Sequence, residues 1–214
     1  MISLKSLAIK GAVWNISGGV LQTIIRLAAS MVLARVLNPF DFGIMGIGMM
    51  IISFLNLISN AGIGAGIVAK RNYNQTDLST AFWFMLIFRV FLFFITYIFA
   101  PFLAAFFNEP RLTDVLRVMS FAFLISVIST VPYSLLSKNL RFFSLNIIQI
   151  LSVALESFIA ILLAVKFHFH YWSLVIAMLI SCLFSQIALF IITGWRPTFE
   201  FSLDSFHYYK KIYH

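Results

Sequence analysis

Long apolar stretches separated by short polar segments dominate the pattern of this sequence. Six of them reach the length of about 20 residues that a helix needs to cross a hydrocarbon core about 30 Å thick. Turn-forming residues such as Asn38-Pro39 and Asn108-Glu109-Pro110 separate them. The pattern predicts an all-α, polytopic transmembrane helix bundle with six spanning helices, at 11–34, 42–66, 80–107, 114–136, 143–165 and 171–193.

The composition agrees with a lipid environment. Hydrophobic residues make up 62% of the 214 residues and charged residues only 10%, whereas soluble domains are roughly 45–50% apolar and about 25% charged. So few charges could not cover the apolar surface against water. The composition therefore excludes a soluble domain.

The distribution of Lys and Arg predicts the orientation of the bundle. Loops that carry more of these residues usually face the cytoplasm. A cytoplasmic N-terminus places nine Lys and Arg inside and four outside: Lys5, Lys10, Lys70, Arg71, Lys138, Arg141, Arg196, Lys210 and Lys211 against Arg35, Arg111, Arg117 and Lys166. Both termini are then cytoplasmic. This bias and anionic lipid headgroups account for the net charge of +8, so membrane lipids rather than nucleic acid are the expected partners.

The chain divides into two parts on this basis. Residues 1–194 are expected to form one six-helix transmembrane lobe, because no Ser/Gly linker interrupts the series of spans. Residues 195–214 are expected to form a cytoplasmic amphipathic segment.

Three ionisable residues stand out within the predicted spans, away from their ends: Arg26, Arg89 and Glu156. Such residues cost about 2.5–3.5 kcal/mol each on the insertion scale and usually face a cavity or a partner. At a rise of about 1.5 Å per residue, Arg26 and Glu156 lie at similar depths, about 22 Å and about 20 Å from the inner ends of their spans. Arg89 lies nearer to the inner end of its own span.

Amides and small residues extend these positions into polar stripes. In the first span, polar and small residues recur at steps of three or four, which stacks them on one helix face. They are Asn15, Gly19, Gln22, Arg26 and Ser30, and the fifth span has Asn146, Gln149 and Glu156 in the same spacing. The second span adds Asn56. These stripes predict a water-filled cavity, or alternatively a set of contacts that only hold helices together, with Arg26–Glu156 as a structural pair. Arg89 could instead extend its side chain toward the cytoplasmic surface.

No motif for catalysis, metal or cofactor is recognised. Cys182 is the single cysteine, and Glu156 is the one carboxylate away from the ends of the predicted spans. No Cys/His cluster has metal-ligand spacing. Asp41-Phe42-Gly43 lacks the catalytic loop that accompanies this triplet in kinases. The chain is therefore expected not to be an enzyme.

Several segments resemble bacterial polysaccharide flippases of the multidrug/oligosaccharidyl-lipid/polysaccharide exporter superfamily. The clearest is GAVWNISGGVLQTIIRLAASMVLARVLNPFDFGIMGI, which is similar to the first span, the outer turn and the start of the second span of that family. NAGIGAGIV, APFLAAFFNEPRLTDVLRV, VPYSLLSKNLRF and GWRPTFEFSLDSF are similar to later segments in the same order. The resemblance covers essentially the whole chain.

The resemblance implies a function and roles for the polar residues. Such proteins move lipid-pyrophosphate-linked oligosaccharide across the inner membrane by alternating access. Arginine suits a pyrophosphate because its planar fork binds oxygen pairs. The resemblance implies headgroup contacts at Arg26 and Arg89, with Arg35 at the outer mouth and Glu156 as a charge partner or proton carrier. The residues expected to line a hydrated path for sugar are Asn15, Gln22, Asn56 and Gln149.

Other functions remain open at this point. One is a cation-coupled multidrug exporter, and another is a non-transporting membrane scaffold for glycan-assembly enzymes. Members of that flippase family have a second, similar lobe. The resemblance therefore implies that this chain corresponds to the N-terminal lobe. A second lobe or a homodimer partner is then expected to complete the cavity.

Overall fold

The computed structural model describes residues 4–60 and 74–198, with side chains at 14–59 and 74–198. The regular elements in these ranges are all helices, six of which are long and apolar enough to cross a membrane. The first four spans are α1 (Leu4–Leu33), α2 (Pro39–Asn60), α4 (Gln75–Phe106) and a composite of α5 (Leu112–Ser126), η1 (Val127–Ser129) and α6 (Thr130–Lys138). The last two are α7 (Phe142–Phe167) and α8 (Tyr171–Thr193). The prediction of six spans in an all-helical bundle is confirmed.

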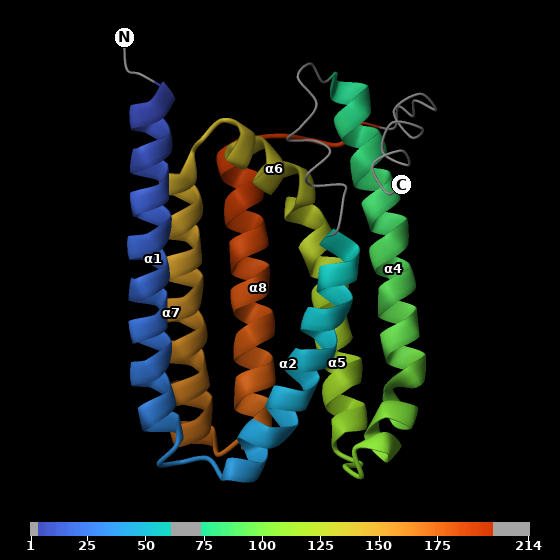
Figure 1. The fold of residues 1–214 in the computed structure, drawn as a ribbon. Coiled ribbons are helices and arrows are strands. Elements are labelled where there is room, and N and C mark those ends of the chain that lie inside the picture. Colours follow the sequence, from blue (N-terminus) through green and yellow to red (C-terminus); the bar gives the residue numbers. More distant parts are fainter. Residues whose placement is uncertain (1–3, 61–73, 199–214) are drawn as a thin grey trace.

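The spans alternate in direction, so α1 begins and α8 ends at the same end of the bundle (Figure 1). Lys138, Arg141 and Arg196 belong to this end, which the charge bias predicts to be cytoplasmic. The six-helix lobe and the segment 195–214 stay predictions as domains. Residues 199–214 lie outside the described part of the chain.

Polar residues at helix starts shift two boundaries from those predicted. Pro39 begins α2, where its missing N–H costs nothing, and the Asp41 carboxylate accepts the Asn38 backbone N–H at 3.2 Å. Asp77 accepts the Asn74 N–H in the same way at 3.0 Å at the start of α4. Hydropathy alone predicts later first residues for these two helices, because their first turns are polar.

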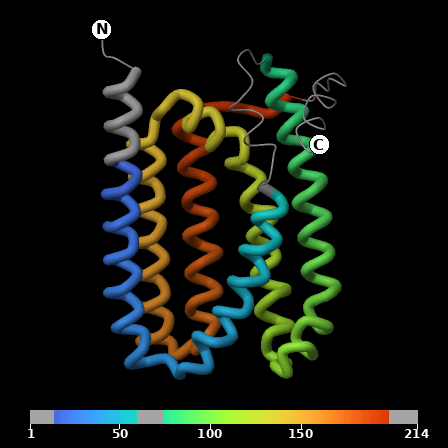
Figure 2. The backbone as a smooth tube through the Cα atoms, viewed as in Figure 1, coloured from blue at the N-terminus to red at the C-terminus, as the bar shows by residue number. Residues whose placement is uncertain are grey.

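The helices pack in a fixed lateral order. The helix α1 packs on α7, α7 on α8, and α8 on α5, which also contacts α4 and α2. The ribbon and tube show α1 with α7 at one edge of the bundle and α4 at the other (Figures 1 and 2). Of the apolar window in the composite span, 56% is buried, against 11% in α1. The composite span is therefore central, and α1 is peripheral.

The centre of the bundle is apolar and closely packed. Val115, Leu116, Met119 and Phe123 of α5 are fully buried in a cluster to which α2, α4 and α8 also contribute. Large apolar side chains cover much of the outer surface, including Phe54, Phe102 and Ile191. That distribution suits a protein whose exterior contacts lipid.

The composite span is interrupted by the 3₁₀ turn η1. Pro132 has no N–H to donate to the carbonyl four residues earlier, and its ring would clash with that carbonyl, so a continuous α-helix is disfavoured just before it. Side chains support the interruption: the Ser126 hydroxyl donates to the Phe123 carbonyl at 2.9 Å and the Ser134 hydroxyl to the Thr130 carbonyl at 2.9 Å.

The segment after α8 crosses to the start of α4. The Trp195 indole donates to the Gln75 side-chain oxygen at 3.1 Å, and the Gln75 amide donates to the Arg196 carbonyl at 2.7 Å. Trp83 donates to the Thr198 carbonyl at 3.0 Å. Residues 195–198 thus join the last span to the third.

Candidate functional site

Three polar side-chain pairs connect α1 to α7. Asn146 Nδ2 donates to Asn15 Oδ1 at 2.9 Å, and Gln22 Nε2 makes a long hydrogen bond of 3.5 Å to Gln149 Oε1. Arg26 Nη2 lies 3.5 Å from Glu156 Oε2. We call these pairs the polar row: Asn15–Asn146, Gln22–Gln149 and Arg26–Glu156.

The row follows from residue spacing on both helices. Steps of three or four residues keep its members on one face of each helix, and the two helices run in the same direction, so the pairs follow one another in the same order along both (Figure 1). Gly18 permits their close approach, because a Cβ at this position would lie 2.5 Å from Asn146 Oδ1. Trp14 and Phe143 pack edge to face beside it, with ring centroids 4.8 Å apart. The polar stripes predicted on the first and fifth spans therefore meet across one interface.

The charged pair lies at bilayer depth but on the surface of the bundle. Arg26 belongs to the apolar window that runs from Trp14 to Leu33. At about 1.5 Å per residue, it is about 18 Å from the first end of that window and about 10 Å from the second. The Arg26 side chain is nevertheless 57% exposed, and that of Glu156 is 21% exposed. A half-exposed guanidinium facing hydrocarbon is costly. This face of α1 therefore suits contact with water or with further protein.

Arg89 occupies a separate environment. It is 5% exposed, on α4, and its guanidinium donates to the Ser126 hydroxyl at the end of α5. The helices α1 and α4 lie at opposite edges of the bundle (Figure 1). The structure brings Arg26 together with Glu156, as the predicted pair, and does not bring Arg89 to the same place.

The remaining predicted residues are also distributed. Arg35 is exposed just beyond α1, at the end of the bundle away from the first turn of α1. Asn56 is half-buried on α2, whose neighbours are α5, α8 and α4. Asn15, Gln22 and Gln149 belong to the polar row. The roles expected for all these residues stay predictions.

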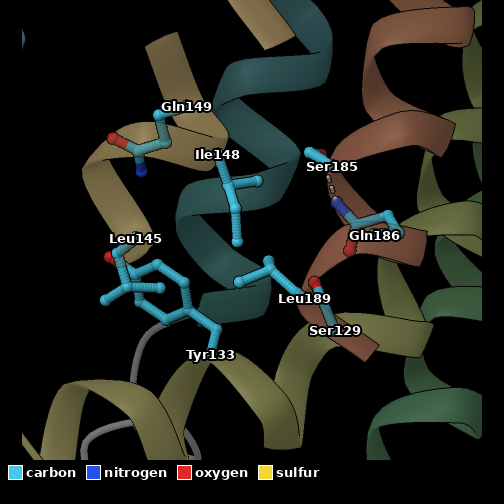
Figure 3. Close-up of a pocket in the computed structure, with 8 residues that line it drawn as sticks. All are labelled: Ser129, Tyr133, Leu145, Ile148, Gln149, Ser185, Gln186 and Leu189. Atoms are coloured by element: carbon cyan, nitrogen blue, oxygen red, sulfur yellow. Dashed lines mark hydrogen bonds between the residues drawn. The ribbon is translucent and has the colours of Figure 1, made fainter. Parts of the chain in front are cut away.

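A cavity of about 210 Å³ adjoins the polar row. Gln149, a member of the row, contributes to its wall together with residues of η1, α6 and α8 (Figure 3). Sequence reasoning did not single out Ser129, Ser185 or Gln186, which also line it. The signal that could have indicated them is an amide, Gln186, inside an otherwise apolar span.

In the described part of the chain, no group of three or more His, Cys, Asp or Glu side chains could hold a metal ion. The chemistry of the polar row is that of hydrogen bonding and charge. Its amides can contact hydroxyl groups, and its guanidinium can contact an anion. A polytopic membrane bundle with such a row at bilayer depth is a candidate to bind a ligand that is both polar and membrane-associated.

Comparison with known proteins places the chain in a family. Residues 32–212 match the family described as polysaccharide biosynthesis protein, and the chain belongs to it. The succinoglycan biosynthesis transport protein ExoT of Rhizobium meliloti is 29% identical over 173 residues, which cover 81% of this chain and 35% of that protein. No solved structure gives a significant match.

Two further relatives extend the comparison. The lipopolysaccharide biosynthesis protein WzxC of Escherichia coli is 23% identical over 95% of this chain and 42% of its own length. The teichuronic acid biosynthesis protein TuaB of Bacillus subtilis is 27% identical over 73% of this chain and 32% of its own. The chain thus spans less than half the length of these curated relatives. The resemblance identified from sequence motifs is confirmed at the level of the family.

Proposed function

We propose that this protein serves polysaccharide biosynthesis as a flippase or exporter. It moves lipid-pyrophosphate-linked oligosaccharide or polysaccharide units across the bacterial inner membrane by alternating access. The observation that carries the proposal is the Arg26–Glu156 pair at bilayer depth, with a half-exposed guanidinium, in line with two amide pairs. Relatives named for transport and polysaccharide biosynthesis support it.

The anionic headgroup binds at Arg26. A pyrophosphate offers paired oxygens, which the guanidinium fork binds in a bidentate manner. Arg26 is accessible on the surface of the bundle, whereas Arg89 is buried against Ser126, so we assign the headgroup contact to Arg26. Arg35 is exposed just after the end of α1, on the side predicted to be outer, where it attracts the headgroup.

Glu156 competes with the substrate for the same cation. Its carboxylate lies 3.5 Å from the guanidinium and compensates that charge when no substrate is present. An incoming pyrophosphate displaces it, and its return favours release of the product. The pair therefore keeps the charge of Arg26 compensated between cycles without holding the substrate permanently.

A second wall of protein faces α1. Alternating access requires two bodies that rock about a bound ligand. Within the described residues α1 packs mainly on α7, and large apolar side chains on its other faces are exposed. A further lobe or a second copy of the chain supplies that wall.

The test is loss of export on removing the cation. Arg26→Gln, introduced into the gene as its host carries it, is expected to reduce surface polysaccharide to the level of the deletion strain while lipid-linked precursor accumulates. Lys166→Gln is the control, because Lys166 is exposed at the end of α7. Normal surface polysaccharide with Arg26→Gln at normal protein levels would contradict the proposal.

A further inference from the structure

The cavity beside the polar row lies where three segments meet. Its lining comes from the interrupted composite span (Ser129, Tyr133), from α7 (Leu145, Ile148, Gln149) and from α8 (Ser185, Gln186, Leu189). Gln149 and Gln186 each lie seven residues from the helix end on the side predicted to be cytoplasmic, which is a depth of about 10 Å. In Figure 3, Leu145 and Gln149 lie across the cavity from Ser185 and Gln186.

The polar groups that line the cavity are neutral. Hydroxyls come from Ser129, Tyr133 and Ser185, and amides from Gln149 and Gln186. Neutral donors and acceptors suit a ligand that is itself neutral and both donates and accepts. Phosphate needs a cationic partner, which this wall lacks. The cavity chemistry therefore differs from that of Arg26.

Gln186 has an acceptor available for such a ligand. The residue is 9% exposed, and its Nε2 donates to Ser185 Oγ at 3.2 Å. Its buried Oε1 has no hydrogen-bond partner among the described residues. A buried acceptor left unsatisfied costs about 1–3 kcal/mol. A rotation of the Gln186 amide toward the cavity would let a ligand hydroxyl satisfy it.

The cavity also lies at an interruption of a span. The 3₁₀ turn η1 contributes Ser129 to its wall. In transporters, discontinuous helices commonly form substrate sites, because irregular backbone inside a membrane is tolerated where it lines a cavity. The position of the cavity therefore favours a ligand site over a packing defect.

Gln149 connects the cavity to the charged pair. Its Oε1 accepts from Gln22, which precedes Arg26 by little more than one helical turn. Four residues of α-helix rise by about 6 Å. A ligand with an anionic group at Arg26 and a neutral polar group next to it would match both sites. On α7, Gln149 and Glu156 are seven residues apart, a rise of about 10 Å, which a sugar ring joined to a pyrophosphate can span.

We propose that this cavity binds one neutral sugar ring, the ring that adjoins the anionic headgroup of the substrate. The identity of the ring as part of a lipid-linked substrate rests on the proposed function. The cavity volume is about 210 Å³. Pockets that enclose drug-sized ligands are larger than this, so the cavity suits a single ring. Hydroxyls of the ring contact the amides of Gln149 and Gln186, and its C–H face packs on Ile148 and Leu189.

The test uses a single cysteine placed in the cavity wall. Cys182 is the one cysteine in the sequence, so a Cys182→Ala chain in lipid nanodiscs gives a background without thiols. Ser185→Cys is added to it, and the rate of labelling by a small, charged methanethiosulfonate is measured. Ile187→Cys is the matched control, because Ile187 lies two residues away on α8 and is 45% exposed on the apolar surface.

Ser185→Cys is expected to react with the reagent and Ile187→Cys to react far more slowly. Glucose or galactose should slow the labelling of Ser185→Cys by the factor 1 + [L]/Kd, about fivefold at four times the Kd. Glycine betaine of equal osmolality should not. Adding Gln186→Leu should remove the protection, since the amide that contacts the ring is gone.

Two results would overturn the assignment. A Ser185→Cys chain that elutes as a folded monodisperse species but does not react would mean that the cavity is closed to water. Labelling that is unchanged by either monosaccharide would mean that the cavity holds water only. This binding measurement is independent of export. Protection by sugar together with normal export in Arg26→Gln would therefore refute the proposed function and leave the sugar site standing.

Discussion

Arg26 and Arg89 are the same residue type within apolar spans, yet their surroundings are opposite. Arg89, on α4, is 5% exposed and faces the interrupted composite span. The Arg26 side chain is 57% exposed at the edge of the bundle and pairs with Glu156 across one helix interface. An arginine in a span costs free energy of insertion in either place. Each arginine therefore needs a partner that stabilises its charge.

Under the proposed function, this difference separates a structural role for Arg89 from a ligand-binding role for Arg26. The Arg89 guanidinium donates to Ser126, the residue immediately before η1, and the Ser126 hydroxyl passes a hydrogen bond on to the Phe123 carbonyl. Arg89 therefore stabilises the interruption of the composite span through Ser126. Arg26 makes a contact that a stronger anion can replace. Changes in the free energy of unfolding distinguish the two roles.

The largest expected effect is that of Arg89→Leu. The substitution removes a buried hydrogen bond and leaves the Ser126 hydroxyl with one contact fewer, so we expect a loss of about 3 kcal/mol in the free energy of unfolding. Denaturant unfolding in detergent, followed by far-UV circular dichroism, measures it. Arg35→Leu, at an exposed site, is the control. Equal midpoints for the two variants would mean that Arg89 does not hold the interruption.

A smaller loss is expected for Gly18→Ala. The added Cβ would lie 2.5 Å from Asn146 Oδ1. The Asn146 amide must therefore move and its bond to Asn15 is lost, at about 1–2 kcal/mol. Gly19→Ala is the matched control, because a Cβ there has nothing within 4 Å. Since alanine favours helix, Gly19→Ala should be neutral or stabilising by up to about 1 kcal/mol. Equal free energies of unfolding for the two variants would mean that α1 and α7 do not approach closely at Gly18.

The smallest effect on stability is expected for the double variant Arg26→Gln, Glu156→Gln. Exposed ion pairs contribute about 0–1 kcal/mol, and replacing both partners leaves no isolated charge in the span. The unfolding midpoint should stay near that of the unchanged protein, although export should be lost. A loss as large as that of Arg89→Leu would indicate that the pair serves the fold and not the substrate.

Much of this architecture could be predicted from residue patterns. Apolar stretches of spanning length predict the six helices, because hydrocarbon allows few alternatives to a helix that satisfies its own backbone. Steps of three and four placed Asn15, Gln22 and Arg26 on one face, and equal depth indicated Glu156 as the partner of Arg26. Those inferences depend only on helix geometry.

Other features depended on which helices are neighbours. Arg89 has the same cost of insertion as Arg26, and the sequence alone does not say that α4 packs against α5 and α1 against α7. The cavity lined by Gln149, Ser185 and Gln186 arises because an interruption at η1 meets two continuous helices. Three segments distant in sequence contribute to it, and no spacing along one segment could have indicated it.

The sequence by itself determined that the chain crosses a membrane six times, and which positions on each helix are polar, because span length and helical periodicity are local properties of the chain. Only the tertiary structure decided that one arginine is buried at the interrupted span while the other remains accessible beside a neutral cavity. The physical reason is that exposure and partnership are set by lateral packing between helices. In a bilayer, that packing is chosen by close fit and hydrogen bonding rather than by hydrophobicity.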